Sequence, residues 1–245
     1  MRGKHNDTSF FLTPGHGPFA AYHYAAVTGV LDATALFSAL PAAVRLELSE
    51  QADLRRFARN DVIFRQGDEA TELFVVSEGR VAIATNARDG RETVVAVLDE
   101  GSLFGEMSMF DDAPRSAEAR ALTDASVVVL SYEPARRVLQ QQPEVLWHVA
   151  RLLVSRLRAT DEALSDAVFL DVPARTAKRL LELAGTDNDF RLGVTQEELA
   201  SMVGASRERV NKAISLFSRL GWLEARGRNR YRILDRPALE ERAMQ

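Results

Sequence analysis

The chain has 245 residues, 46% of them hydrophobic, and its 31 basic and 35 acidic residues give a net charge of −4. This length suits two modest domains, each with its own core. The absence of cysteine excludes disulfides, thiolate zinc sites, cysteine-ligated iron–sulfur clusters and thiol nucleophiles. No apolar run approaches the roughly 18 residues of a membrane span, and the first residues lack the order of a secretory signal. We therefore expect a cytoplasmic protein with no membrane partner.

The charge is distributed unevenly along the chain. Residues 1–172 carry 17 basic and 25 acidic side chains, whereas residues 173–245 carry 14 basic and 10 acidic ones. Residues 205–236 contain nine basic side chains and only three acidic ones. This division predicts that only the second part of the chain binds a polyanion.

The first half of the chain predicts an extension followed by a β-rich domain. Residues 1–31 show no periodic pattern, so we expect a disordered extension without an assigned function. A domain is predicted over residues 32–142. It starts with two short helices. Between Ala52 and Tyr132 it continues as short β-rich runs separated by turn glycines, a pattern typical of a sandwich or barrel; the runs are residues 62–64, 72–76, 80–85, 92–98 and 125–130. The runs alone leave open whether this domain binds a small molecule or is structural.

A long helix is predicted after Pro143, within a segment of dimerisation helix and hinge at residues 143–171. Its seam positions are spaced alternately by four and three residues: Leu146, Ala150, Leu153, Leu157, Thr160, Leu164 and Ala167. Three heptads predict a two-stranded coiled coil and therefore a homodimer; the alternative is a helix that packs on its own barrel. The polar seam residue, Thr160, would fix the helix register or face a ligand.

A candidate ligand site lies within the β-rich region, between the runs at residues 92–98 and 125–130. Gly105-Glu106-Met107 is followed, after a loop, by Arg115-Ser116-Ala117. Gly105 allows close backbone approach, and a short helix starting near Glu106 would direct N–H groups to one point. Arg115 suits a phosphate, while the hydroxyl and carboxylate beside it suit a sugar, so the motif indicates a ribose phosphate. The alternative is a Glu106–Arg115 salt bridge that closes a loop.

The last part of the chain, residues 172–245, predicts a DNA-binding domain. Thr195 begins a capping box, its helix ends at Gly204, and Ser206 caps the next helix, which makes a helix-turn-helix. The second helix carries side chains that can read base edges from the major groove: Arg207, Glu208, Arg209, Asn211 and Lys212. A hairpin around Gly227 adds a basic wing for phosphates, including Arg226 and Arg228. The alternative is a solvated charged surface.

Residues 32–236 resemble the CRP/FNR (catabolite activator protein-like) family of cyclic-nucleotide-sensing transcription regulators. The segment from Gly105 to Ala117 is similar to that family's phosphate-binding cassette, and the helix from Arg207 to Lys212 to its recognition helix. The resemblance implies an α+β fold with an N-terminal jelly-roll β-barrel, a long dimerisation helix and a C-terminal winged helix-turn-helix domain.

The same resemblance implies roles for individual residues. Arg115 and Ser116 would hold the cyclic phosphate and Glu106 the ribose 2′-hydroxyl. Thr160-Asp161 stands where the family has an adenine-contacting Thr-Ser pair, so Asp161 departs from the pattern. Lys212 departs as well, because the family's array ends in Arg, whose bidentate geometry Lys lacks.

We therefore predict a homodimeric, sequence-specific transcription regulator that binds palindromic double-stranded DNA under the control of a cyclic nucleotide. Cyclic AMP is the expected effector, cyclic GMP remains open, and RNA polymerase is a candidate partner. No catalytic residues are predicted, and the four histidines (His5, His16, His23, His148) offer no haem or metal site, so we expect no further cofactor. Two alternatives remain: a DNA-binding regulator whose barrel is structural and needs no ligand, and a regulatory cyclic-nucleotide module without DNA binding.

Overall fold

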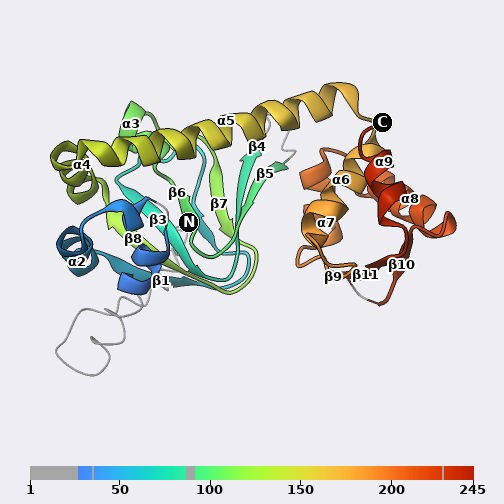
Figure 1. The fold of residues 1–245 in the computed structure, drawn as a ribbon, viewed down its shortest axis with the longest axis horizontal. Helices are drawn as coiled ribbons and strands as arrows, with labels where there is room; N and C mark the ends of the chain where they lie inside the picture. The colour runs from blue at the N-terminus through green and yellow to red at the C-terminus, as the bar shows by residue number, and fades with distance from the viewer. Residues whose placement is uncertain (1–26, 35, 87–91, 228) are drawn as a thin grey trace, which may run out of the picture. The chain divides into compact units, whose positions relative to one another are not determined.

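The computed structural model describes residues 27–34, 36–86, 92–227 and 229–245 (Figure 1). The chain forms two compact units. The first consists mainly of the β-barrel and the residues up to Leu152, and the second consists mainly of residues from Leu153 onward.

The barrel is built from two four-stranded sheets. The first has the order β1 (Asp53–Phe57), β8 (Ala125–Ser131), β3 (Glu72–Glu78), β6 (Leu103–Phe104), and the second has the order β2 (Val62–Phe64), β7 (Glu118–Ala121), β4 (Val81–Asn86), β5 (Glu92–Leu98). The strands of the first sheet pair antiparallel, with Phe74 opposite Val129 in the register of β3 and β8.

Strand β3 explains why the central strands have continuous apolar sequences. Leu73 and Val75 belong to a core that includes helical residues outside the barrel, whereas Phe74 and Val76 belong to the core inside it. Successive side chains of a strand point to opposite faces, so a strand covered on both faces needs apolar residues at every position. The apolar runs thus specify a sheet that is covered on its outer face by helices.

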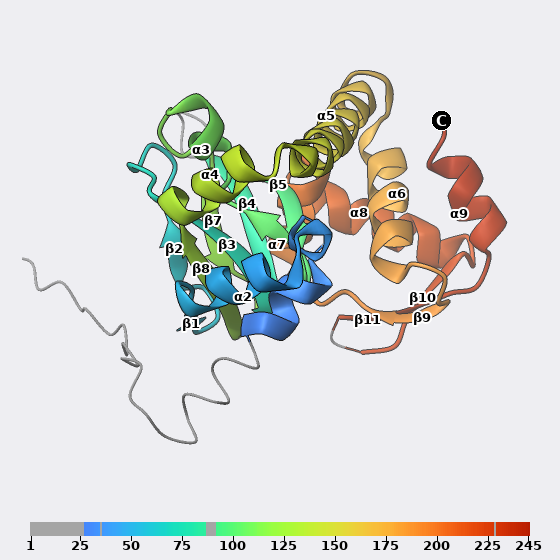
Figure 2. The same ribbon diagram turned by 60° about the vertical axis from the view of Figure 1, so that its left-hand side comes forward.

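The covering helices are α2 (Ala42–Glu50) and α4 (Tyr132–Gln141), which pack against each other and lie at the same end of the barrel in both views (Figures 1 and 2). The short helices η1 (Phe37–Ala39) and α3 (Met107–Asp111) complete this unit. Residues 27–33 are also helical, and Val27 and Leu31 are fully buried in the outer core. The prediction of a disordered extension up to residue 31 is therefore wrong for residues 27–31; residues 1–26 lie outside the described residues.

The connecting segment consists of η2 (Pro143–Val145) and the 24-residue helix α5 (Leu146–Phe169), close to the predicted bounds. The second unit contains α6 (Val172–Ala184), β9 (Asp189–Arg191), α7 (Gln196–Val203), α8 (Arg207–Arg219), β10 (Leu223–Ala225), β11 (Arg230–Ile233) and α9 (Arg236–Arg242). Strand β9 joins the predicted hairpin to give a sheet of order β10-β11-β9, and α6 packs against α8 and α9. No helix in the described part of the chain has the length and apolarity to cross a membrane.

Candidate functional site

The predicted ligand motif forms a turn, a short helix and a loop at one end of the barrel. Strand β6 leads into Gly105 and Glu106, α3 follows, and the chain returns through Arg115 into β7. Backbone hydrogen bonds from Arg115 N to Asp68 O and from Gly67 N to Arg115 O, both 2.9 Å, fix the returning loop to the β2–β3 connection. The returning half of the motif is thus fixed by a segment that lies more than forty residues earlier in the chain.

Arg115 is buried, with 6% of its surface exposed. Its Nη1 donates to the carbonyl oxygen of Gly105 (2.6 Å) and to the phenol oxygen of Tyr132 (3.0 Å), and its Nη2 donates to the carbonyl oxygen of Glu72 (2.7 Å). The guanidinium also lies over the ring of Phe64, with Cζ 4.2 Å from the ring centroid. Burial lowers the pKa of Arg115, but a guanidinium stays charged in any protein. The acceptors of these three hydrogen bonds, two backbone carbonyls and a phenol, are neutral groups.

Gly105 is the residue that makes this packing possible. Its φ of +73° is favourable only for glycine, and a Cβ atom at this position would lie 2.8 Å from Arg115 Nη1 and 3.0 Å from the Phe74 ring. The close backbone approach that the sequence predicts therefore occurs toward Arg115 itself.

The other motif residues, which neighbour Gly105 or Arg115 in the sequence, differ in how far they are exposed. Glu106 is buried, with 1% exposed, and Ala117 is buried with 7% exposed. Ser116 is exposed, and its hydroxyl donates to the Met107 sulfur at 3.6 Å. Met107 itself is 47% exposed. A buried cation, a buried carboxylate and an exposed hydroxyl within one short segment match the chemistry of an anion beside a sugar.

Thr160 and Asp161 lie on the exposed surface of α5. The Thr160 hydroxyl donates to the carbonyl oxygen of Arg156 at 2.9 Å, one helical turn earlier. The seam that contains Thr160 is exposed over much of its length, including Leu157 (60%) and Leu164 (64%), whereas Val149 on another face is buried (4%) in the outer core of the barrel. The start of α5 therefore packs on its own barrel, while the apolar seam beyond it has no cover within the described chain.

The helix-turn-helix follows the predicted local signals. The Thr195 hydroxyl accepts from Glu198 N, and the Glu198 carboxylate accepts from Thr195 N, which completes the capping box of α7. Gly204 ends α7 in the left-handed region, and the Ser206 hydroxyl accepts from Arg209 N at the start of α8. Four buried residues anchor α8: Val210, Ala213, Ile214 and Phe217. The hydroxyls of Thr195 and Ser206 thus cap the N-terminal ends of α7 and α8.

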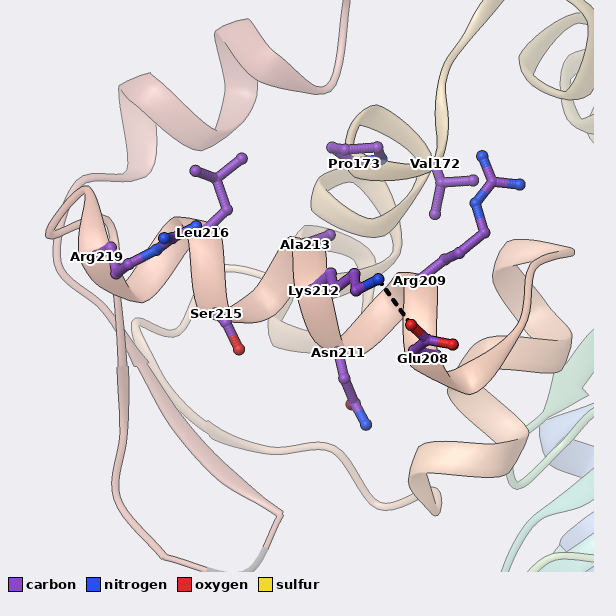
Figure 3. A pocket seen from close by; sticks show the side chains of 10 residues that line it. All are labelled: Val172, Pro173, Glu208, Arg209, Asn211, Lys212, Ala213, Ser215, Leu216 and Arg219. Atoms are coloured by element: carbon purple, nitrogen blue, oxygen red, sulfur yellow. Dashed lines mark ion pairs between the residues drawn. The ribbon is translucent and has the colours of Figure 1, made fainter.

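A pocket lies beside α8 and the start of α6, and six of its ten lining residues have polar or charged side chains (Figure 3). Glu208, Asn211, Lys212 and Ser215 are spaced as neighbours on one helix face. Lys212 Nζ lies 2.6 Å from Glu208 Oε1, and this hydrogen bond and charge lower the pKa of Glu208. Asn211 and Ser215 point to one side of the helix in Figure 3, whereas Arg209 points toward Val172 at the start of α6. Arg207 is exposed at the first position of α8.

The predicted basic wing is partly neutralised within the protein. Arg226 Nε lies 2.8 Å from Glu224 Oε2, and Arg226 Nη1 lies 3.4 Å from Asp189 Oδ2. The Glu224 hydrogen bond raises the pKa of Arg226. Arg232 is 3.8 Å from the same Asp189, and Arg228 lies outside the described residues. The sequence did not predict β9, and therefore did not predict that Asp189 lies beside the wing. It also did not predict how far carboxylates neutralise the positive charge of the wing arginines.

Several residues of both sites were missing from the predictions. Around Arg115 they are Phe64, Glu72, Phe74 and Tyr132, which come from β2, β3 and the start of α4. On α8, Ser215 and Arg219 also line the pocket. The helical spacing of Ser215 from Lys212 was the signal that could have identified it, whereas nothing local in the sequence connects Tyr132 to Arg115.

Comparison with known proteins connects both sites to characterised domains. A model described as "Cyclic nucleotide-binding domain" matches residues 54–142, and one described as "Crp-like helix-turn-helix domain" matches residues 174–242. The chain is 35% identical over 207 residues to the "CRP-like cAMP-activated global transcriptional regulator" of Mycobacterium tuberculosis, covering 82% of this chain and 92% of that protein. It is 33% identical over 184 residues to the "cAMP-activated global transcriptional regulator Vfr" of Pseudomonas aeruginosa, covering 71% and 86%.

Solved structures give the same result. The c-di-GMP responsive global regulator CLP of Xanthomonas campestris superposes with a TM-score of 0.70 at 28% identity, covering 79% of this chain and 99% of that one. A CRP-family transcriptional regulator of Thermus thermophilus gives a TM-score of 0.65 at 30% identity, with 78% and 96% covered. The predicted fold class is confirmed, and the similar proteins of established function are transcription regulators.

Proposed function

The chain belongs to the CRP/FNR family of transcription regulators, and from this membership we propose that it is a homodimer whose DNA binding is controlled by cyclic AMP. Its two matched domains are a cyclic-nucleotide-binding domain and a helix-turn-helix domain. The effector, the dimer and the coupling between the two domains are the parts of the proposal that go beyond the family.

The observation that carries the cyclic-nucleotide assignment is the buried Arg115. A guanidinium whose hydrogen-bond partners are neutral and which has almost no exposed surface keeps a positive charge inside the barrel, which a phosphodiester would neutralise. Ser116 would donate to the same phosphate and Glu106 would accept from the ribose 2′-hydroxyl. Two relatives above 30% identity are named as cAMP-activated, which supports cyclic AMP as the nucleotide.

The exposed seam of α5 supports the dimer. Its apolar side chains include Leu146, Leu153, Leu157 and Leu164, each more than a third exposed. A heptad seam of this kind is covered when two helices wind around each other. In the proposed complex Thr160 and Asp161 contact the base, and Asp161 accepts from the adenine amino group.

Ligand and dimer together provide the proposed control of DNA binding. Cyclic AMP would favour one arrangement of the two long helices and so set the spacing of the two recognition helices, α8 and its counterpart. A two-fold dimer then matches half-sites about one DNA turn apart in a palindrome, with the α8 face at base edges and Thr195, Arg226 and Arg228 at phosphates. Such a regulator acts on DNA in the cytoplasm, and RNA polymerase is its candidate partner.

Calorimetric titration tests the effector directly. Cyclic AMP is titrated into the purified protein and into Arg115→Leu, with cyclic GMP and c-di-GMP as competitors. Saturable binding of one cyclic AMP per chain that is lost in Arg115→Leu is the expected result. Sedimentation of the same protein should give twice the 27.1 kDa chain mass.

A second candidate function is that of a DNA-binding regulator whose barrel is structural and binds no ligand. The hydrogen bonds of Arg115 to Gly105, Glu72 and Tyr132 favour it, because they are also those of a structural residue. A folded dimer that binds no cyclic nucleotide in the titration would establish this candidate, and Arg115 would then be part of the barrel core.

A further inference from the structure

The hydrogen bonds of Arg115 leave the Nε–H donor of its guanidinium without an acceptor among the described residues. A guanidinium has five N–H donors in a fixed planar arrangement. Nη1 uses both of its donors, on Gly105 O and Tyr132 Oη, and Nη2 uses one on Glu72 O. Nε is buried and has no hydrogen-bond partner among the described residues.

An unpartnered buried donor is costly unless something supplies an acceptor. The Nε–H and one Nη2–H lie parallel along the same edge of the group, which is the geometry that binds two oxygens of a phosphate. The opposite end, Nη1, is held by the barrel. Arg115 therefore has one anchored end, Nη1, and one buried donor without a partner, Nε–H, on the edge that Nε shares with Nη2.

Tyr132 is the side chain that holds the anchored end. Its hydroxyl donates to Gly105 O at 2.5 Å and accepts from Arg115 Nη1 at 3.0 Å, so the phenol and the guanidinium share one carbonyl. Burial raises the pKa of Tyr132, which keeps the phenol protonated and able to donate at neutral pH. The ring of Phe64 packs against the guanidinium and supports it.

We propose that Tyr132 is a positioning residue that fixes the Nη1 end of Arg115 to the Gly105 carbonyl and so directs the Nε edge at the cyclic phosphate. This inference rests on the proposed function, because it assumes that Arg115 meets a phosphodiester. It assigns part of the phosphate affinity, and the choice between the two exocyclic oxygens, to a residue outside the Gly105–Ala117 motif.

The test uses the full-length protein and calorimetric titration with three ligands: cyclic AMP and its two phosphorothioate diastereomers, in which sulfur replaces one or the other exocyclic oxygen. Tyr132→Phe keeps the ring and removes the hydroxyl, and with it the hydrogen bonds to Gly105 O and Arg115 Nη1. Tyr231→Phe is the matched control, because it removes a phenol that bonds Gln196 in the other unit. We expect Tyr132→Phe to weaken cyclic AMP binding about tenfold and to reduce the preference between the diastereomers, with no change in Tyr231→Phe.

A double-mutant cycle separates positioning from general damage to the fold. Arg115→Lys keeps the charge but lacks the planar edge. In that background Tyr132→Phe should change cyclic AMP affinity by less than about twofold, because the group that Tyr132 positions is gone. An equal loss in both backgrounds would overturn the inference, as would unchanged affinity and diastereomer preference in Tyr132→Phe. If the unmutated protein binds none of the three ligands, the proposed function fails and this inference fails with it.

Discussion

Arg115 in the barrel and Lys212 on α8 are both assigned to an anionic or polar ligand, yet their surroundings are opposite. Arg115 is 6% exposed and bonds two carbonyl oxygens and a phenol. The side chain of Lys212 is 73% exposed, and its partner Glu208 is 76% exposed. One site uses a single buried cation held by the barrel, and the other uses several solvated side chains on one helix face.

The difference has a physical consequence for each interaction. In the barrel, water and salt ions are largely excluded, so one charge can contribute strongly, but its position depends on close packing around it. On α8 each contact is weak and screened, so affinity depends on many contacts and on counterion release from DNA. The two ligands should therefore respond differently to salt, to packing changes and to single substitutions.

The largest expected difference is in salt dependence. DNA affinity should fall by roughly a thousandfold between about 50 and 200 mM salt, because a dimer that contacts several phosphates releases as many counterions. Cyclic AMP affinity, which depends on the buried Arg115, should change by less than about threefold over the same range. Fluorescence anisotropy with labelled duplex and calorimetry with cyclic AMP measure the two slopes. A shallow slope for DNA would contradict the proposed α8 and wing interface.

The second difference concerns packing, and two glycines provide a matched pair. Gly105 and Gly204 both have positive φ, but an added Cβ at Gly105 meets Arg115 and Phe74, whereas at Gly204 it meets nothing within 4 Å. We expect Gly105→Ala to lower the free energy of unfolding by about 3 kcal/mol, from strain and overpacking together, and Gly204→Ala by about 1 kcal/mol from strain alone. Chemical denaturation followed by circular dichroism measures both. Equal losses would mean that the Arg115 site is not closely packed.

A single substitution on α8 should have a smaller effect. Arg207→Ala should weaken binding to a selected duplex by about 2 kcal/mol and relax the base preference at one position, because a base contact is lost. Arg219→Ala, at the far end of the same helix, should weaken binding less and equally for all sequences. Anisotropy with the selected and a scrambled duplex distinguishes these results; an Arg207→Ala effect that is the same on both duplexes would assign Arg207 to phosphate.

The smallest expected effect is a pH dependence in the second unit. The Asp171 carboxylate caps α6 through Ala174 N and accepts from Arg242. Burial alone would raise the pKa of Asp171, but these hydrogen bonds hold that pKa below its ordinary value. A lowered pKa means that the stabilisation is present at neutral pH and is lost as the pH falls below about 4.

Asp171→Asn keeps the capping oxygen and removes the charge, so it isolates this contribution. Its free energy of unfolding should be about 0.5–1 kcal/mol lower at pH 7, and its dependence on pH between about 5 and 3 should be flatter. Thermal unfolding across that range makes the comparison. Parallel pH curves for the two proteins would show that Asp171 does not contribute to the acid sensitivity.

The same contrast explains how far the sequence alone could predict this molecule. Strands β2, β3, β4, β5 and β8 were predicted because their apolar residues mark them. Strands β1, β7 and β9 were not predicted, because polar residues such as those of Glu118–Ala121 enter a sheet only through pairing with neighbours, and the two-residue strand β6 is too short to give a pattern. The caps of α7 and α8 depend on adjacent residues and were predicted correctly. The environment of Arg115 depends on Tyr132 and Phe64, which only the barrel topology brings to it.

The regulation proposed for this protein is control of DNA binding at α8 by a cyclic nucleotide in the barrel. It is tested most directly by measuring the affinity for a duplex selected from random-sequence DNA, with and without saturating cyclic AMP, in the unmutated protein and in Arg115→Leu. We expect cyclic AMP to tighten DNA binding at least tenfold in the unmutated protein and to have no effect in Arg115→Leu. Equal affinity with and without cyclic AMP in the unmutated protein would contradict it.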